Sequence, residues 1–143
     1  MNAAEPSVEH LGTVELRIPS KPEWVAVARL AVAAIANRLP FSVEEIEDLK
    51  LAIAEACTIC IQHSVGNATI DITCDAAATS LRVEVRDGRY RTQSEGAAKR
   101  HPATAVEGEG LGIFLIQALM DNLEYNVDPA TGAQLVMTKL AGA

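Results

Sequence analysis

The sequence contains few aromatic residues, no long apolar run and no recognisable export signal. Only five of its 143 residues are Phe, Tyr or Trp, so the single domain expected at this length must build its core mainly from Ala, Val, Ile and Leu. The longest mainly apolar stretch, residues 24–39, is interrupted by Arg29 and Arg38 and is too short and too polar to cross a bilayer. The first ten residues include Glu5 and Glu9 and lack the basic start and apolar centre of a secretory signal. We therefore expect a cytoplasmic protein without a membrane segment.

Basic residues are outnumbered by acidic ones. The chain has 12 Lys and Arg against 19 Asp and Glu, a formal net charge of −7. No run of Lys and Arg forms the positive patch that contacts with phosphate backbones require. Direct binding of nucleic acid is therefore not expected.

Cysteine is also rare. The three residues, Cys57, Cys60 and Cys74, cannot all pair with one another, and without an export signal a disulfide framework is not expected. Cys57 and Cys60 have the spacing of a redox or zinc half-motif, but they lie in a strongly helical pattern and no second ligand pair follows. We interpret all three as reduced residues of the core.

Hydrophobic periodicity divides the chain into an N-terminal tail, residues 1–13, and one domain, residues 14–143. Period-two alternation predicts strands at 14–18, 68–74, 81–85, 123–127 and 133–140, and spacings of three and four predict helices at 22–39, 42–63 and 111–119. Ser42 and Glu45 have the spacing of a capping box at the start of the long second helix. Residues 88–110 show no sustained period and exceed the usual length of a structureless connection, so we interpret them as a lid loop.

The order of these elements predicts a two-layer α/β sandwich. Residues 75–80 are short enough to join their flanking strands as an antiparallel hairpin, and Asp-Pro-Ala-Thr-Gly at 128–132 is a typical turn between the last two strands. Paired strands separated by helices favour a mostly antiparallel sheet, covered on one face by about three helices, over a doubly wound parallel fold.

A glycine cluster lies where the lid leads into the third helix. Gly108, Gly110 and Gly112 alternate with Glu109 and Leu111. Glycines let the backbone approach a ligand closely, and the free amides at a helix start favour an anion such as phosphate. The spacing differs from that of a P-loop and no lysine follows it. The cluster alone therefore leaves a phosphate site and a flexible hinge as alternatives.

Two acidic residues are the other candidates for a site. Glu55 lies on the second helix, where spacings of four place it in line with Ile59 and His63, and a solvated helix carboxylate is its alternative role. Asp87 ends an apolar strand just before the lid. Its carboxylate can accept a hydrogen bond from the amino group of a bound base, or it can cap the turn.

Together and in this order, these elements resemble the anti-sigma-factor serine kinases of bacterial partner-switching systems, which belong to the GHKL ATPase superfamily. The resemblance rests on residues 49–58 followed by His63, on Val-Glu-Val-Arg-Asp-Gly at 83–88, and on Gly-Leu-Gly-Ile-Phe-Leu-Ile at 110–116 with Leu-Met-Asp at 119–121. It covers residues 14–140, nearly the whole chain, and the last block is its most specific part.

The resemblance implies a histidine-kinase-like ATPase fold that binds ATP or ADP. It also implies a homodimer that holds a sigma factor in check and phosphorylates a serine of an anti-sigma antagonist protein. By position, Glu55 matches the glutamate that acts as base toward the substrate hydroxyl, and Asp87 matches the aspartate that contacts the adenine amino group. The other residues assigned to nucleotide binding are Gly88, Gly108, Gly110, Leu111, Gly112 and His63.

Two departures from the family pattern bear on activity. Ile59 occupies the position, four residues after the glutamate, where the family has a metal-binding asparagine. Isoleucine has no lone pair, and Mg²⁺ requires near-octahedral oxygen ligation while it bridges the phosphates. We therefore assign no metal-binding residue, and Mg²⁺ is left without its usual protein ligand. Arg89 replaces a glycine two residues after Asp87, so the backbone path beside the adenine is expected to differ.

Three interpretations follow from the sequence. In the first, the chain is a regulatory binding module for a sigma factor or an antagonist, with an ATP-type nucleotide site and impaired kinase activity. In the second, it is an active serine/threonine kinase in which water and the phosphates complete the metal shell. In the third, it is a stand-alone α/β domain whose glycines are hinges. Ile59 favours the first interpretation, while Glu55, Asp87 and the glycines favour the second.

Overall fold

The computed structural model describes residues 9–64, 66, 68–88, 110–128 and 132–142, and the backbone of residues 101–102. Its elements are β1 (His10–Pro19), the 3-10 helix η1 (Pro22–Trp24), α1 (Val25–Ala36), α2 (Val43–Gln62), β2 (Thr69–Ala77), β3 (Ser80–Asp87), β4 (His101–Pro102), α3 (Gly110–Leu119), β5 (Asn122–Asp128) and β6 (Gly132–Leu140). Their order agrees with the periodicity of the sequence, except that the short strand β4 falls within the segment interpreted as a lid.

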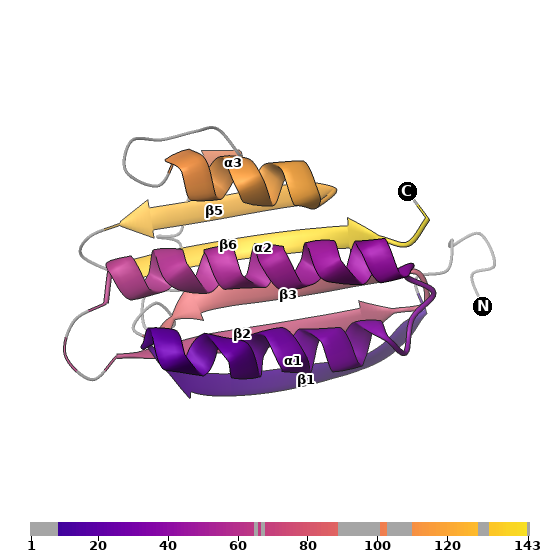
Figure 1. The fold of residues 1–143 in the computed structure, drawn as a ribbon, viewed down its shortest axis with the longest axis horizontal. Coiled ribbons are helices and arrows are strands. Elements are labelled where there is room, and N and C mark those ends of the chain that lie inside the picture. Colours follow the sequence, from indigo (N-terminus) through magenta and orange to yellow (C-terminus); the bar gives the residue numbers. More distant parts are fainter. Residues whose placement is uncertain are drawn as a thin grey trace, which may run out of the picture.

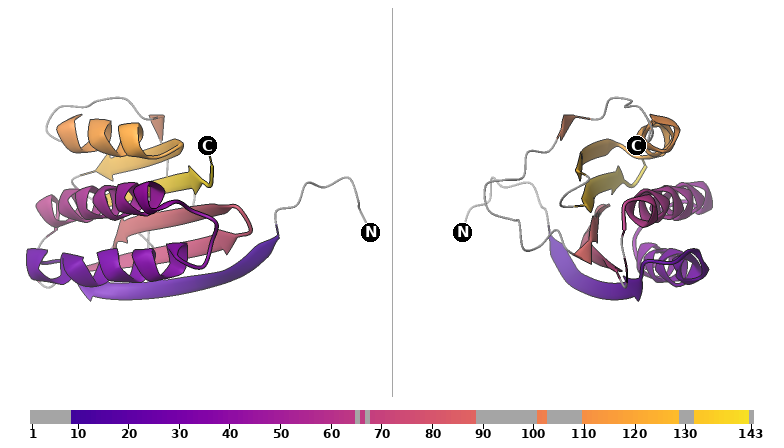
Figure 2. Two further views of the ribbon diagram at one scale, coloured as in Figure 1. Left: turned by 45° about the vertical axis from the view of Figure 1, so that its right-hand side comes forward. Right: turned by 90° about the vertical axis from the view of Figure 1, so that its left-hand side faces the viewer.

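The strands form one sheet, and the helices lie on one of its faces. The strand order is β1-β2-β3-β6-β5-β4, and each pairing within the described residues is antiparallel. Figure 1 shows α1, α2 and α3 in front of the strands, with α2 over β3 and β6. Figure 2 shows that the helices form a single layer on that side. The predicted two-layer α/β sandwich with an antiparallel sheet is therefore confirmed.

The long helix α2 begins where the sequence places a capping box. The Glu45 backbone N–H donates to Ser42 Oγ at 3.0 Å, and the Ser42 N–H donates to Glu45 Oε1 at 2.8 Å. These two bonds satisfy amides near the helix start that have no partner within the helix. The predicted capping box is confirmed, and it fixes the residue at which α2 starts.

The first helix is shorter than its periodicity predicts. Residues 22–24 form the separate turn η1, and α1 ends at Ala36 rather than at Leu39. The amides of Arg38 and Leu39 bond to carbonyls three residues back, as in a tight turn. The residue before a proline avoids helical backbone angles, so the chain leaves the helix before it reaches Pro40.

Strands β1 to β3 run beyond their predicted ends because backbone pairing continues where the apolar alternation stops. β1 begins at His10, which pairs with Ala77, so residues 10–13 of the predicted tail belong to the sheet. The hairpin of β2 and β3 is confirmed, but its turn contains only Ala78 and Thr79. The side chains at these strand ends are small, charged or exposed, so they carry no apolar period-two signal.

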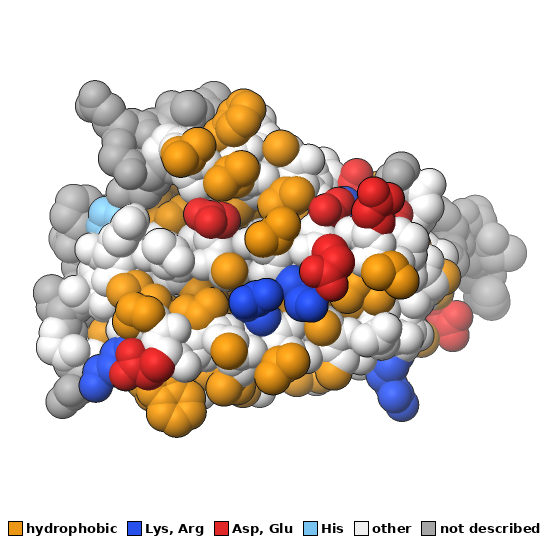
Figure 3. Space-filling model, viewed as in Figure 1, with side chains coloured by type: hydrophobic (Ala, Val, Ile, Leu, Met, Phe, Trp, Pro, Cys, Tyr) orange, Lys and Arg blue, Asp and Glu red, His pale blue; other side chains and the backbone are white. Residues whose placement is uncertain are grey.

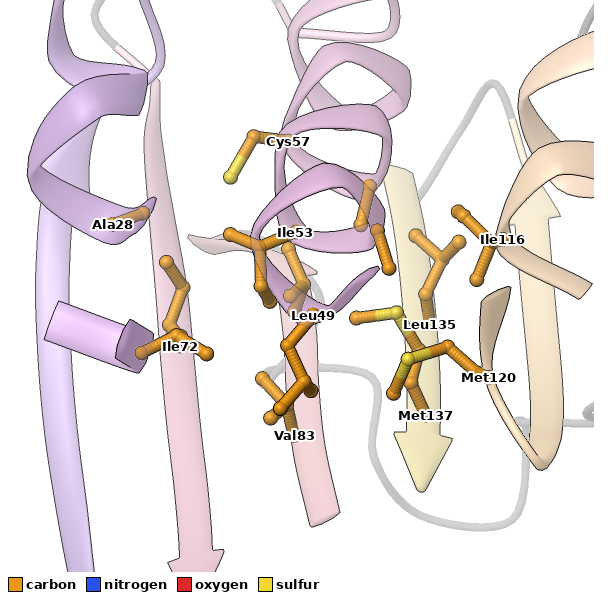
Figure 4. Packing of buried hydrophobic residues seen from close by; sticks show 14 of the residues in the cluster. Ala28, Leu49, Ile53, Cys57, Ile72, Val83, Ile116, Met120, Leu135 and Met137 are labelled. Carbon is orange, nitrogen blue, oxygen red and sulfur yellow. The ribbon is translucent and has the colours of Figure 1, made fainter. Parts of the chain in front are cut away.

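The core lies between the helix layer and the sheet. In Figure 4, Leu49 of α2 meets Val83 of β3, and Ile116 of α3 points toward Leu135 of β6. All four side chains are fully buried. Although this core is apolar, none of the helices in the described ranges has the length and apolar character needed to cross a membrane.

The other face of the sheet carries charged side chains. Arg17 Nε of β1 donates to Asp71 Oδ1 of β2 at 2.7 Å. On β3, Arg86 Nη1 lies 3.4 Å from Glu84 Oε2. These strands therefore alternate between apolar side chains that face the helices and charged side chains that face away.

The three cysteines are buried free thiols, as the sequence analysis predicts. Burial raises the pKa of Cys57 and of Cys74 to about 12. Burial also raises the pKa of Cys60 well above its ordinary value. The thiols therefore stay protonated at neutral pH, which fits packing residues rather than redox or metal-binding groups.

Candidate functional site

Glu55 and Ile59 of α2 meet the start of α3. The two side chains lie about one helical turn apart on the same face of α2. A Cβ atom placed on Gly112 would lie 3.4 Å from Glu55 Oε1 and 3.4 Å from Ile59 Cδ1. Because Gly112 has no side chain, α3 packs closely on both residues. The structure thus brings Glu55 and Ile59 of the second helix next to Gly112 of the glycine cluster.

The environments of these two α2 side chains differ. Ile59 is 2% exposed, whereas Glu55 is only partly buried. Among the described residues, the Glu55 carboxylate has no hydrogen-bond or ion-pair partner. A carboxylate in this state is available to accept a hydrogen bond or a proton from a group placed at the start of α3.

The first turn of α3 supplies backbone amides next to Glu55. The helix begins at Gly110, so Gly110, Leu111 and Gly112 form this turn. Amides at a helix start lack partners within the helix, and the helix dipole favours a negative charge there. The Leu111 side chain is 73% exposed, so the group that Leu111 can offer to a site at this turn is its backbone amide.

Most of the predicted lid, including Gly108, lies outside the described residues. Residues 101–102 form β4, which pairs with β5, and Gly110 already belongs to α3. The phosphate role of Gly108 therefore stays a prediction.

Asp87 lies at the end of β3 and is 1% exposed. Gly132, at the start of β6, has a φ of +97°, and a Cβ there would lie 2.6 Å from Asp87 Cβ and 2.8 Å from Asp87 Oδ2. Gly88 packs in a similar way on Thr69, because a Cβ there would lie 3.2 Å from the Thr69 carbonyl oxygen. Gly132 therefore leaves no room for a side chain next to Asp87, and Gly88 leaves little room next to Thr69.

Cys60 of α2 interacts electrostatically with Asp87. Burial is the main cause of the raised pKa of Cys60, and unfavourable electrostatic interactions with Cys57 and Asp87 add to it. Asp87 thus acts electrostatically on Cys60, the residue that follows Ile59 in α2. His63 follows as the C-cap residue of α2 and is partly buried.

Gly132 and Thr69, at this end of the sheet, are not among the site residues predicted from the sequence. Gly132 closes the Asp-Pro-Ala-Thr-Gly turn, and its sequence context explains it fully as a turn residue. Its contact with Asp87 follows from the pairing of β3 with β6, which the local sequence does not encode. No sequence pattern marks Thr69, because its contact with Gly88 depends on how the chain folds.

The side chains at the contact of α2 with α3 do not fit a Mg²⁺ site of the family type. Ile59 presents a terminal methyl group beside Glu55, where the resemblance places an asparagine oxygen. Mg²⁺ binds oxygen ligands in near-octahedral geometry, and an aliphatic side chain offers none. The replacement of the asparagine by Ile59 therefore removes an oxygen ligand from the place where the family resemblance expects the metal.

Two histidine kinase structures are among the solved structures to which this chain is similar. The histidine kinase domain of the blue-light activated histidine kinase EL346 from Erythrobacter litoralis is 19% identical, with a TM-score of 0.48, over 86% of this chain and 61% of that one. The catalytic domain of histidine kinase ThkA is 11% identical, with a TM-score of 0.48, over 91% of this chain and 97% of that one.

Sequence comparisons are more specific. The serine-protein kinase RsbW of Bacillus cereus strain G9842 is 32% identical over 141 residues, which cover 92% of this chain and 87% of the relative. RsbW of Halalkalibacterium halodurans is 35% identical over 135 residues, which cover 89% of this chain and 82% of the relative. The sequence model of the histidine kinase-like ATPase domain matches residues 18–139. The chain therefore belongs to the histidine kinase-like ATPase family, in the group of serine-protein kinases that includes RsbW.

Proposed function

We propose that the protein is an RsbW-type regulator that binds ATP or ADP together with a sigma factor or an anti-sigma antagonist, and that its phosphoryl transfer is impaired. The observation that carries the proposal is Ile59, whose buried side chain borders Glu55 and Gly112. The family resemblance places a metal-binding asparagine at this position. The proposal includes the homodimer and the cytoplasmic location expected from the sequence.

Two features support a nucleotide site. The amides in the first turn of α3 favour a phosphate group, because they lack helical partners and lie at the positive end of the helix dipole. Asp87 is a buried carboxylate at the end of β3, and its two oxygens can accept several hydrogen bonds, including one from an exocyclic amino group. In this proposal Asp87 binds the adenine and the first turn of α3 binds the phosphates, with α2 beside both.

Impaired transfer follows from the charges at the phosphate end. A bound Mg²⁺ would supply positive charge that offsets the negative charge of the phosphates during transfer. With Ile59 in place of a ligand, a phosphate group beside Glu55 would face another negative charge, and two unit charges about 4 Å apart interact by about 4 kcal/mol near a protein surface. A loss of about 3 kcal/mol in transition-state stabilisation would slow transfer roughly 100-fold.

The test compares Ile59→Asn with Ile59→Leu, because leucine has the shape of asparagine without its lone pairs. ATP binding to each full chain is measured by calorimetry with Mg²⁺ and with EDTA, and ATP hydrolysis is measured in parallel. We expect the affinity of the wild type and of Ile59→Leu to change little with Mg²⁺. Ile59→Asn should gain about tenfold in affinity when Mg²⁺ is added, and its hydrolysis should rise. Unfolding curves of both variants show whether the buried amide costs stability, by about 1–3 kcal/mol if it lacks a partner.

The alternative function is an active serine/threonine kinase. The observation that favours it is the unpartnered Glu55 carboxylate beside the first turn of α3. Strong Mg²⁺-dependent ATP binding and hydrolysis by the wild type, unchanged in Ile59→Asn, would support this alternative and contradict the proposal.

A further inference from the structure

Helix α3 exposes an apolar face to solvent. None of its residues, Gly110–Leu119, is charged. Ile113 and Ile116 are buried, whereas Leu111, Phe114 and Leu115 are 73%, 59% and 37% exposed. The exposed residues follow the spacing of one helical stripe, and a surface helix normally carries polar side chains there. Figure 3 shows hydrophobic side chains gathered over α3.

The neighbouring surface of α2 is acidic. Five carboxylates lie on this helix against a single lysine: Glu44, Glu45, Glu47, Asp48 and Glu55 against Lys50. Lys50 Nζ lies 3.0 Å from Glu47 Oε2, and Lys139 Nζ of β6 lies 3.5 Å from Asp48 Oδ2. Within the described residues, Glu44 and Glu55 have no ion-pair or hydrogen-bond partner. The surface beside α3 therefore keeps an excess of negative charge.

The apolar face is continuous with the candidate site. Leu111 belongs to the same first turn as Gly112, which contacts Glu55 and Ile59. On α2, Leu51 is 52% exposed and lies one turn before Glu55. A ligand on the exposed stripe of α3 would therefore lie next to the carboxylate that the proposed function requires.

We infer that the stripe Leu111, Phe114 and Leu115 is the docking surface for an amphipathic helical segment of the partner protein, with an apolar row flanked by Lys and Arg. The apolar row would cover the stripe, and the basic residues would face the carboxylates of α2. Exposed apolar patches of this kind mark interaction sites, and an amphipathic helix covers such a surface through residues spaced by three and four. This inference rests on the proposed function, because it gives the chemistry of the partner that the regulator binds.

The test uses three fluorescent 14-residue peptides and the full chain with ATP present. One peptide has a leucine row flanked by lysines, the second has the same row flanked by glutamates, and the third is a scrambled form of the first. We expect the first to bind most tightly, as measured by fluorescence anisotropy, and its affinity to fall as salt is raised, because exposed charges are screened. Equal binding of the acidic peptide, equal binding of the scrambled peptide, or no binding of any peptide overturns the inference.

Matched variants locate the binding surface. Phe114→Ser should weaken binding of the first peptide at least about tenfold, since burial of a phenylalanine side chain is worth more than 1.4 kcal/mol. Leu30→Ser is the control, because Leu30 is 68% exposed on α1. Equal effects of the two variants contradict the inference. Calorimetric binding of ATP to the same samples separates the two proposals: normal ATP binding without peptide binding refutes only the docking surface, and peptide binding without ATP binding refutes only the nucleotide site.

Discussion

Gly132→Ala probes the tightest contact of the candidate site. Gly132 is buried, has a φ of +97°, and lies against the side chain of Asp87. An added Cβ would lie 2.6 Å from Asp87 Cβ and 2.7 Å from Asp87 Cγ, so one of the two strands or the carboxylate must move. The variant therefore perturbs both the backbone of β6 and the position of the predicted adenine-binding group.

Two costs set the magnitude. An L-residue in a left-handed backbone conformation costs about 1–2 kcal/mol, and overpacking in a filled interior costs about 1–3 kcal/mol. We therefore expect Gly132→Ala to lower the free energy of unfolding by about 2–5 kcal/mol, a large part of the roughly 5–15 kcal/mol of a typical domain. With an m-value of about 1–3 kcal/mol/M, a loss of about 3 kcal/mol lowers the urea midpoint by about 1–3 M.

Urea unfolding monitored by circular dichroism measures this effect, and Gly66→Ala is the matched control. Gly66 has a φ of +59°, but a Cβ there would meet nothing within 4 Å. Its substitution should therefore show the backbone cost alone, about 1–2 kcal/mol. The difference between the two variants isolates the contact with Asp87. ATP affinity should fall in Gly132→Ala and stay unchanged in Gly66→Ala.

Equal urea midpoints for the two variants would refute the packing argument, because the contact with Asp87 would then cost nothing. Lower stability of Gly132→Ala with unchanged ATP affinity would support the packing but contradict the nucleotide role of Asp87.

Two further predictions concern titratable groups. A hydrogen bond from the Ser42 backbone N–H holds the pKa of Glu45 below its ordinary value of 4.5, so this carboxylate stabilises the fold above that pH and loses its contribution as the pH falls through the lowered pKa. Glu45→Gln, which keeps the cap, should flatten the decline of the urea midpoint between about pH 5 and pH 3, and an unchanged slope would contradict this linkage. The buried thiols of Cys57, Cys60 and Cys74 should resist Ellman's reagent in the folded protein and all react in guanidinium chloride; a thiol that reacts rapidly before unfolding would show that its burial is wrong.

The sequence by itself determined the features that depend on neighbouring residues. The capping box of Ser42 and Glu45 is a local pattern of hydrogen bonds, and the structure confirms it. The order of helices and strands follows from periodicities of two and of three to four residues. The motifs at residues 49–58, 83–88 and 110–121 were together enough to predict the family, although Ile59 departs from its pattern.

Only the tertiary structure decided which distant residues meet. The pairing of β6 with β3 places Gly132 against Asp87, and the packing of α3 on α2 places Gly112 against Glu55 and Ile59. Periodicity identifies the apolar face of an element but not the element that covers it, so these contacts cannot be obtained from local patterns. The same holds for helix α3. Both faces of this helix are apolar, so the sequence does not show which face is buried; only the packing shows which one faces solvent.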